Sequence, residues 1–456
     1  MLGRSLLLNN SEGDPVGFVF YAQRQNTDTL QYPLWSYVDN ADNVYLAVGY
    51  GTAYLAYQII KFDSTGTVQW TSNIDNYDGT PVKVSYLNSQ SILIINPFIA
   101  GVGNNNDLYV MTMADDIQAY FTKISLSDGS LISSKKYTNP DRPQTHTLPL
   151  QNMSLVNSAG DLHFGIRDIY FNYNHIIKVA NNGIPHWVQA LDTNVVPACI
   201  VLDNSNNIYA GVTDLVVTYG DRCGVTKLNS SGDRQWDKQY SWYNGGNLNN
   251  LDEIAQYIAH DSVNNALYLI TRRLYNSTYN NYLLKIDPAN GDLLWTKELT
   301  SLTAYTDVIG LAVDSEGYVH VGISDNLLID MLKIDHLGVV QDTLRMTFSG
   351  TSIDASYTKF HMSSNDQLYF SSKESGNNSV WVVSIPASYR VYGKYHLSIY
   401  SDYVQFGLTS STISDSTHYV YDTSYSTLTA DGLITTTDVT AYSIAERPFT
   451  YYYTDI

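Results

Sequence analysis

The chain is built around the stretch Asp39-Asn40-Ala41-Asp42-Asn43-Val44-Tyr45-Leu46-Ala47-Val48-Gly49 and, shortly after it, Ile59-Ile60-Lys61-Phe62-Asp63-Ser64-Thr65-Gly66-Thr67-Val68-Gln69-Trp70. Each half joins a polar turn to apolar strand residues. Val313–Gly322 repeats the first half, and Leu283–Trp295 repeats the second. The sequence therefore contains an internal repeat, which is the first feature to establish before a fold is predicted.

The repeat has four recurring positions, spaced roughly 50 residues apart. A Tyr or His follows a polar turn at Tyr45, Tyr109, His163, Tyr209, Tyr268, His320 and Tyr369. A lysine in an apolar strand comes next, at Lys61, Lys123, Lys178, Lys227, Lys285 and Lys333, and Ser384 takes the seventh place. A turn glycine follows at Gly66, Gly129, Gly183, Gly232, Gly291 and Gly338. In four copies a tryptophan stands four residues after that glycine: Trp70, Trp187, Trp236 and Trp295.

Each copy predicts four short strands, which in the first copy are residues 34–38, 44–50, 57–62 and 68–72. Side chains alternate there between apolar and polar, as half-buried strands do. Helix signals are nearly absent. Four-stranded units of this length are typical of β-propeller blades.

The two ends of the repeat region complement each other. The seventh copy has three strands, about 358–362, 367–371 and 380–385, and no fourth. The stretch around Gly17-Phe18-Val19-Phe20-Tyr21 is a strand without the three that should precede it. We therefore predict an all-β protein: a seven-bladed β-propeller over residues 16–386, closed by its N-terminal strand, with residues 1–15 as an N-terminal arm. Closure of this kind removes strand edges that invite aggregation.

Residues 387–456 lack the repeat. They hold many Ser and Thr, 12 Tyr, and three Lys or Arg against seven Asp or Glu. So few aliphatic residues make a thin core. We expect a small β-rich module that packs on the propeller or on a neighbouring chain and serves docking or oligomerisation.

Composition excludes several classes of function. The net charge of −19 disfavours binding to nucleic acid, which requires clustered Lys and Arg. No apolar run is long enough for a membrane helix, so no membrane insertion is expected. The apolar run at the start of the chain is too short for the core of a signal peptide. We expect a protein that stays inside its producing cell, one that leaves the cell by lysis or assembly, or one whose leader has been removed. Cys199 and Cys223 fall on two strands of one predicted blade, where a single bridge is geometrically possible, but free, buried thiols are the expectation.

The blade, with its apolar strand, Asp, turn Gly and Trp, resembles the tryptophan-docking repeat of the pyrroloquinoline-quinone-type and related bacterial propellers. The resemblance covers residues 16–386 and implies a structural role for Trp70, Trp187, Trp236 and Trp295, buried between blades. Quinoprotein dehydrogenases of this fold hold their cofactor with a vicinal disulfide, and Cys199 and Cys223 are not adjacent. The turn Asp63–Trp70 also departs from the Ser-x-Asp-x-Gly-x-x-Trp box of sialidases.

Candidate sites are few. We predict no catalytic residues, no metal site and no cofactor; Asp39, Asp42 and the Asp203–Asn207 run could bind Ca²⁺ but fit turn formation better. The loop Tyr240–Asn250 carries two adjacent aromatics, Trp242 and Tyr243, among flexible polar residues. Aromatics in such loops are used in sugar and protein recognition, which makes Trp242 and Tyr243 the candidate binding residues. The alternative is a loop folded over its own tryptophan.

Three functions remain open. The first is a non-enzymatic structural or adhesive component of a virion, such as a tail, fibre, neck or capsid-decoration protein of a tailed phage. Its partners would be other structural proteins or copies of itself, with a host-surface glycan as a further candidate. The second is a secreted or cell-surface propeller that binds polysaccharide or protein. The third is a quinoprotein-like or glycosidase-like enzyme, which the missing site residues disfavour.

Overall fold

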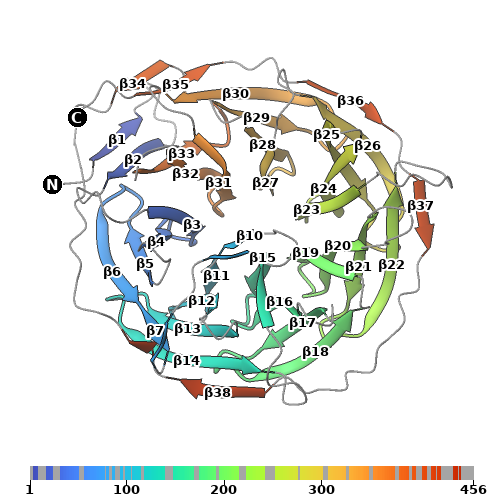
Figure 1. Cartoon of the computed structure of the whole chain (residues 1–456). Helices are drawn as coiled ribbons and strands as arrows, with labels where there is room; N and C mark the ends of the chain where they lie inside the picture. Colours follow the sequence, from blue (N-terminus) through green and yellow to red (C-terminus); the bar gives the residue numbers. More distant parts are fainter. Residues whose placement is uncertain are drawn as a thin grey trace.

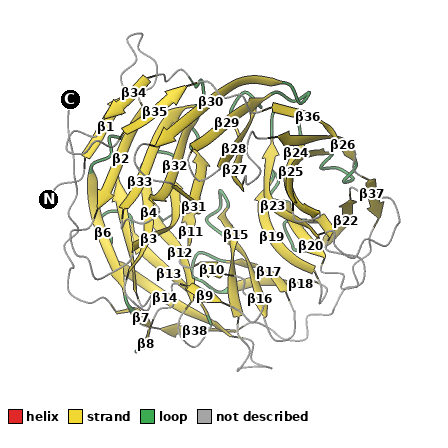
Figure 2. Cartoon of the chain, turned by 45° about the horizontal axis from the view of Figure 1, so that its top comes forward, coloured by secondary structure: helices red, strands yellow, loops and turns green. Residues whose placement is uncertain are grey.

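The computed structural model is all-β, and no helix in the part of the chain that it describes is long and apolar enough to cross a membrane (Figure 2). The described residues are 4–8, 17–23, 31–50, 56–77, 79–81, 85–87, 93–95, 98–103, 105–113, 118–138, 147–168, 174–191, 195–214, 222–241, 252–275, 278–300, 307–324, 328–348, 353–374, 379–389, 393–396, 403–407, 412–416, 419–422, 435–439 and 441–442.

Seven antiparallel blades surround a common centre, so the predicted seven-bladed propeller is confirmed (Figure 1). The first strand of each blade lies nearest the centre and the fourth lies at the rim. Blade 1 is β3 (Gln31–Val38), β4 (Val44–Tyr50), β5 (Ala56–Phe62) and β6 (Val68–Ile74). These bounds match the strands predicted for the first copy of the repeat to within three residues at each end.

Blades 2 to 6 follow in chain order. Blade 2 is β11 (Phe98–Val102), β12 (Asp107–Met113), β13 (Ala119–Ser125) and β14 (Leu131–Thr138); blade 3 is β15 (Thr147–Val156), β16 (Leu162–Asp168), β17 (Asn174–Val179) and β18 (Pro185–Leu191); blade 4 is β19 (Val195–Leu202), β20 (Ile208–Asp214), β21 (Arg222–Leu228) and β22 (Arg234–Ser241); blade 5 is β23 (Asp252–Asp261), β24 (Ala266–Tyr275), β25 (Thr278–Ile286) and β26 (Leu293–Thr300); blade 6 is β27 (Asp307–Val313), β28 (Val319–Ser324), β29 (Leu328–Ile334) and β30 (Val340–Phe348). Two short hairpins, β7 (Asn76–Tyr77) with β8 (Thr80–Pro81) and β9 (Ser85–Leu87) with β10 (Leu93–Ile95), lie between blades 1 and 2 in the chain.

The middle strands form the core. Every residue of β12 and β28 is buried, because each blade is covered on both faces by its neighbours. One apolar cluster runs from Trp35 in blade 1 to Val179 in blade 3, and others join blade 4 to 5 and blade 5 to 6. Burial on both faces explains why these strands contain apolar residues at nearly every position.

Blade 7 is closed by the N-terminus, as the orphan strands predict. It contains β31 (Ile353–Met362), β32 (Gln367–Glu374) and β33 (Ser379–Pro386), and β2 (Gly17–Gln23) pairs antiparallel with β33. β1 (Arg4–Leu8) then pairs with β2 as a fifth strand. The segment expected to be an arm thus contributes a strand to the same blade.

The strands of residues 387–456 do not gather into one sheet of their own. They follow the outside of the propeller in the reverse order of the blades (Figure 1). β34 (Gly393–His396) and β35 (Tyr403–Gly407) form a hairpin on blade 6, and the others pair singly: β36 (Thr412–Ser416) with blade 5, β37 (Tyr419–Asp422) with blade 4, β38 (Thr435–Val439) with blade 2, and β39 (Ala441–Tyr442) with β7. A segment with so few aliphatic residues lacks a core, and the blade edges supply the backbone hydrogen bonds it needs.

The propeller core extends past the expected boundary at Pro386. Ala387 and Tyr389 are buried in the same cluster as Val383 and Ile385. The Ala387 amide donates to Asp366 O at 2.9 Å, which ties the start of the tail to the turn between β31 and β32. The propeller therefore needs residues up to Tyr389.

Candidate functional site

The repeated Tyr, Lys and Trp side chains meet at the junction between neighbouring blades. In blade 1, Lys61 Nζ lies 5.7 Å from the centroid of the Tyr45 ring, and the Tyr45 and Trp70 rings are 6.0 Å apart. Lys61 Nζ and Trp70 Nε1 both donate to Leu126 O of blade 2, at 3.1 and 2.8 Å. One carbonyl group of the next blade is thus held by two donors from this one.

Blades 4 and 5 repeat this contact. Lys227 Nζ and Trp236 Nε1 donate to Pro288 O at 2.9 and 3.3 Å. Lys285 Nζ and Trp295 Nε1 donate to His336 O at 2.8 and 3.2 Å. The repeat therefore encodes an interface between blades, which explains why its positions recur.

The tryptophan rings also cover turn glycines of the following blade. Gly129 has a φ of 74°, and a Cβ added there would lie 2.6 Å from Cε3 of Trp70. Gly232 has a φ of 88° and would place a Cβ 2.8 Å from Trp187. A side chain at either glycine is therefore excluded both by backbone conformation and by space.

The four predicted structural tryptophans are not equally buried. Trp70 is 8% exposed. Trp187, Trp236 and Trp295 donate to a carbonyl group of the next blade in the same way but are half-buried. The sequence predicts four equivalent buried rings, and the structure buries one of them almost completely and three of them in part.

Blade 6 replaces this set with a buried histidine network. His320 Nε2 and Lys333 Nζ lie 2.9 and 3.1 Å from Asp314 Oδ2, and His320 Nδ1 lies 2.7 Å from the hydroxyl of Tyr389. Burial opposes ionisation of Asp314, but the hydrogen bonds from His320 and the Tyr318 amide outweigh it and lower the Asp314 pKa to about 2. Asp314 thus stays a carboxylate that holds β28 and β29 together through His320 and Lys333. His320 in turn contacts Tyr389, which follows β33 in the chain.

Blade 3 contains two histidines whose environment disfavours the charged form. Burial, with nearby Lys178, lowers the pKa of His163 to about 4, although Asp161 acts in the opposite direction. Burial alone lowers the pKa of His175 to about 4. Both imidazoles are therefore neutral near pH 7.

We expect the protein to lose stability as the pH falls from about 6.5, the ordinary histidine pKa, to about 4, the folded value of both histidines. Within that window the two histidines are protonated in the unfolded chain but remain neutral in the folded chain. Acidification therefore favours unfolding by on the order of 3 kcal/mol per histidine. Urea unfolding midpoints measured at neutral and mildly acidic pH give the change. The pKa values of His260 and His320 are lowered by burial as well, so His163→Tyr, which installs the residue that most other blades carry, should remove only the share of the acid effect that His163 causes. An equal loss in the variant would show that His163 does not cause it.

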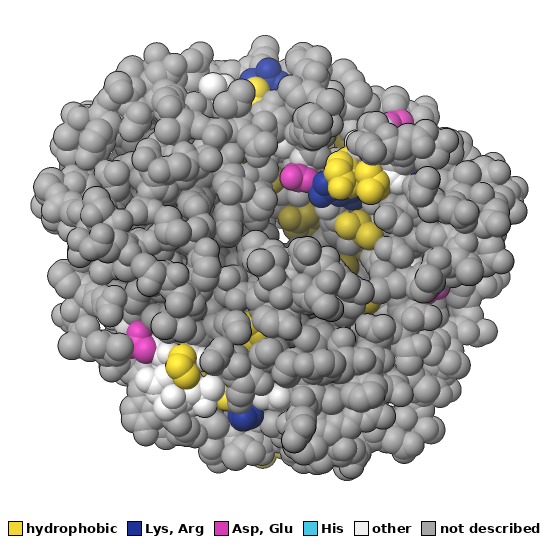
Figure 3. Space-filling model, viewed as in Figure 1, with side chains coloured by type: hydrophobic (Ala, Val, Ile, Leu, Met, Phe, Trp, Pro, Cys, Tyr) yellow, Lys and Arg dark blue, Asp and Glu magenta, His cyan; other side chains and the backbone are white. Residues whose placement is uncertain are grey.

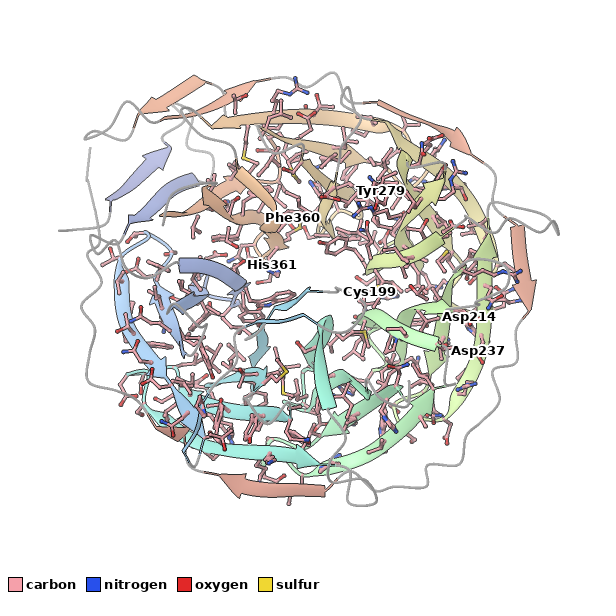
Figure 4. The ribbon with its side chains drawn as sticks, viewed as in Figure 1. Cys199, Asp214, Asp237, Tyr279, Phe360 and His361 are labelled. Carbon is pink, nitrogen blue, oxygen red and sulfur yellow. The ribbon has the colours of Figure 1, made fainter. Side chains whose placement is uncertain are left out.

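The loop end of blade 5 departs from the other blades. Its central hairpin extends to the pair Tyr275 and Thr278, and Tyr279 is 39% exposed (Figure 4). The Arg272 guanidinium lies 3.8 Å from the centroid of the Tyr279 ring, and its Nη1 is 2.8 Å from Asp307 Oδ1 in blade 6. This places an exposed aromatic ring, a cation and a carboxylate on one face of the propeller.

A buried polar layer supports this loop end on the side of blade 4. Glu253, 2% exposed, accepts from Thr271 Oγ1 at 3.2 Å. The Arg273 guanidinium lies 5.1 Å from the Tyr282 ring centroid, and Asn280 Nδ2 donates to Glu298 Oε1 at 2.7 Å. These contacts fix the strands that carry Arg272 and Tyr279.

Figure 3 shows the surface of this face. Described hydrophobic side chains gather beside Lys or Arg and Asp or Glu atoms over blade 5, next to the hollow at the centre. Tyr279, Arg272 and Asp307 are residues of these three kinds in that part of the fold. We call these three the blade 5 cluster.

The binding residues predicted from the sequence, Trp242 and Tyr243, lie outside the described residues, so their positions stay a prediction. Cys199 and Cys223 are free and buried, as expected. Within the described ranges no three His, Cys, Asp or Glu side chains are grouped so that they could hold a metal ion.

The sequence pattern does not single out the blade 5 cluster. One signal was available: Arg272 and Arg273 stand four and five residues after Tyr268, where the fourth copy has Thr213 and Asp214. Tyr279 gives no such signal, because it is one of 39 tyrosines and follows the alternation of an ordinary strand.

The strand order of the described residues defines this protein as a seven-bladed β-propeller. No protein-family model and no curated protein matches the sequence. Among solved structures, the chain is similar to the Dos1 propeller, with 10% identity over 80% of this chain and 94% of that chain and a TM-score of 0.46. It is also similar to polysaccharide lyase Uly1 (9% identity, 84% and 100% covered, TM-score 0.49) and to an oligogalacturonate lyase in complex with manganese (10%, 85% and 98%, 0.46). At such identities these likenesses concern the fold alone.

Proposed function

We propose that this protein acts by binding, without catalysis, as a structural component of a virion: a tail, fibre, neck or capsid-decoration protein of a tailed phage. Its partners are other structural proteins or copies of itself. The observation that carries the proposal is the use of both chain ends. The N-terminal strands complete blade 7, and the strands of residues 393–442 run along the outside of blades 6, 5, 4 and 2.

This use of the ends suits a protein that must persist outside a cell. A ring opens most readily where its first and last blades meet, and here that junction is made by strand pairing. The tail strands add a second set of contacts, because they pair with the outer edges of blades 6, 5, 4 and 2. Extra contacts of this kind slow unfolding, which determines survival where no chaperone acts.

The chemistry of the repeat also supports binding over catalysis. Lys61, Lys227 and Lys285 are engaged by carbonyl groups of the next blade. Lys333 and His320 are engaged by Asp314. These groups could serve as acids, bases or nucleophiles, but here the three lysines hold neighbouring blades together and the Asp314 contacts hold the strands of blade 6 together.

The tail strands are also the natural docking surface at the rim. β34, β36, β37 and β38 are the outermost strands of their sheets, so a neighbour that approaches the rim meets them first. The tail is rich in Tyr, which provides a large contact area at a small cost in conformational entropy.

We expect a chain that ends at Tyr389 to fold but to fail to assemble. The cut keeps Tyr389, whose loss would leave His320 Nδ1 without its partner in the core. Full-length and shortened chains are each supplied to particles that form without the native copy, and the particles are sedimented. Only the full-length chain should sediment with them, and neither should show hydrolase or dye-linked dehydrogenase turnover.

Incorporation of the shortened chain would remove the docking role of the tail. A full-length chain that remains a monomer outside particles would favour the alternative, a secreted or cell-surface propeller that binds polysaccharide or protein. Turnover that depends on a quinone would overturn the binding proposal as a whole.

A further inference from the structure

We propose that the blade 5 cluster, Tyr279 with Arg272 and Asp307, is a carbohydrate subsite that holds one uncharged sugar ring. The inference rests on the proposed function, that this protein acts by binding, and it names the class of ligand. It would give a virion component a means of attaching to glycan on a surface.

The aromatic ring is the first reason. Tyr279 is among the few large hydrophobic side chains that are exposed in the described residues, and the others sit at turns on the opposite ends of the strands or on the rim. Stacking on Arg272 at 3.8 Å holds the ring in place while 39% of the residue stays accessible. The C–H face of a pyranose packs on such a ring, and a ring held in advance costs little entropy to bind.

The polar partners are the second reason. The Arg272 side chain is 23% exposed, and its guanidinium carries N–H donors beyond the one that Nη1 directs at Asp307. Asp307, whose side chain is 40% exposed, has acceptor capacity beyond its contact with Arg272 Nη1. A donor and an acceptor beside an aromatic face match neighbouring hydroxyl groups of a sugar.

The charge of the cluster selects among sugars. Arg272 and Asp307 form an ion pair, so the cluster is neutral overall. The whole chain carries a net charge of −19, which repels anionic polysaccharides. The chemistry therefore fits a neutral hexose or a glycan that presents one, and binding should depend little on ionic strength.

Preorganisation beneath the cluster is the third reason. The hydrogen bond from Asn280 to Glu298 and that from Thr271 to Glu253 hold the two strands that carry Tyr279 and Arg272. A site on paired strands with a supported base keeps its geometry better than a site on a loop.

The test is binding of the full-length protein to an array of immobilised neutral oligosaccharides that present glucose, galactose, mannose or N-acetylglucosamine. Tyr279→Ala should reduce binding to the preferred sugar by about tenfold or more, as truncation of an aromatic anchor does. Tyr279→Phe, which keeps the ring, should bind almost as well as the unchanged protein. The control is Leu337→Ala, since Leu337 is 64% exposed and lies in the turn between β29 and β30, at the other end of the strands.

No binding to any neutral sugar, or equal binding by Tyr279→Ala, overturns the inference. So does a tagged protein that captures a protein partner through Tyr279 and Arg272 instead. The variants are also supplied to forming particles. Tyr279→Ala should still sediment with them, so that failure of the subsite and failure of the proposed particle role are seen separately.

Discussion

Removal of residues 1–23 is expected to open the propeller and to lower its thermal unfolding midpoint by about 10 °C or more. β2 pairs along its length with β33, from Phe18 opposite Ser384 to Gln23 opposite Ser379. Without residues 1–23, blade 7 loses its two outer strands, β1 and β2, and the ring loses its closure. Circular dichroism during heating measures the change.

The matched control is a chain that begins at residue 9. It lacks β1, the fifth strand of blade 7, but keeps the closing strand β2. Its midpoint should fall much less. If the chain without residues 1–23 has the same unfolding midpoint as the unchanged protein, the N-terminal strand does not close the ring.

Trp70→Ala is expected to cost about 3–5 kcal/mol of unfolding free energy, the usual range for an emptied aromatic core site. The ring is 8% exposed, covers Gly129 and donates to Leu126 O at 2.8 Å. Loss of the ring leaves a cavity between blades 1 and 2. It also leaves Lys61 Nζ as the remaining side-chain donor to Leu126 O. Urea unfolding gives the free energy.

Trp187→Ala provides the comparison within the same repeat. Trp187 is half-buried and its hydrogen bond to Ser230 O is longer, at 3.3 Å. We expect a cost well below that of Trp70→Ala. Equal costs would mean that the four positions contribute alike and that burial does not rank them.

The fold could be predicted from the sequence because each blade repeats the residues that contact the next. Lys61 and Trp70 are visible in the sequence for the same reason that they matter in the structure: both donate to the following blade. The closing strand could be predicted because the seventh copy of the repeat ends at residue 386 without a fourth strand, and an unassigned strand begins near residue 17. Such contacts recur, so they leave a pattern.

The path of the tail could not be predicted. β36, β37 and β38 are short, and their pairing depends on edges that exist only after the propeller has formed. Tyr389 was assigned to the tail because it follows Pro386, whereas its hydroxyl lies against His320 in the core. Neither feature leaves a periodic signal.

The candidate site was also hidden. Trp242 and Tyr243 stand out in the sequence because they interrupt a polar loop. Tyr279 and Arg272 gain their relation from a hairpin that places them together, and Asp307 arrives from the next blade. A site assembled across two blades has no contiguous motif to find.

We propose that this propeller is a structural part of a virus particle. The most direct test is mass spectrometry of density-gradient fractions from a lysate of the cells that produce it. We expect the chain to band with intact particles and to remain with them after a high-salt wash. Recovery of the chain only as free protein at the top of the gradient would contradict it.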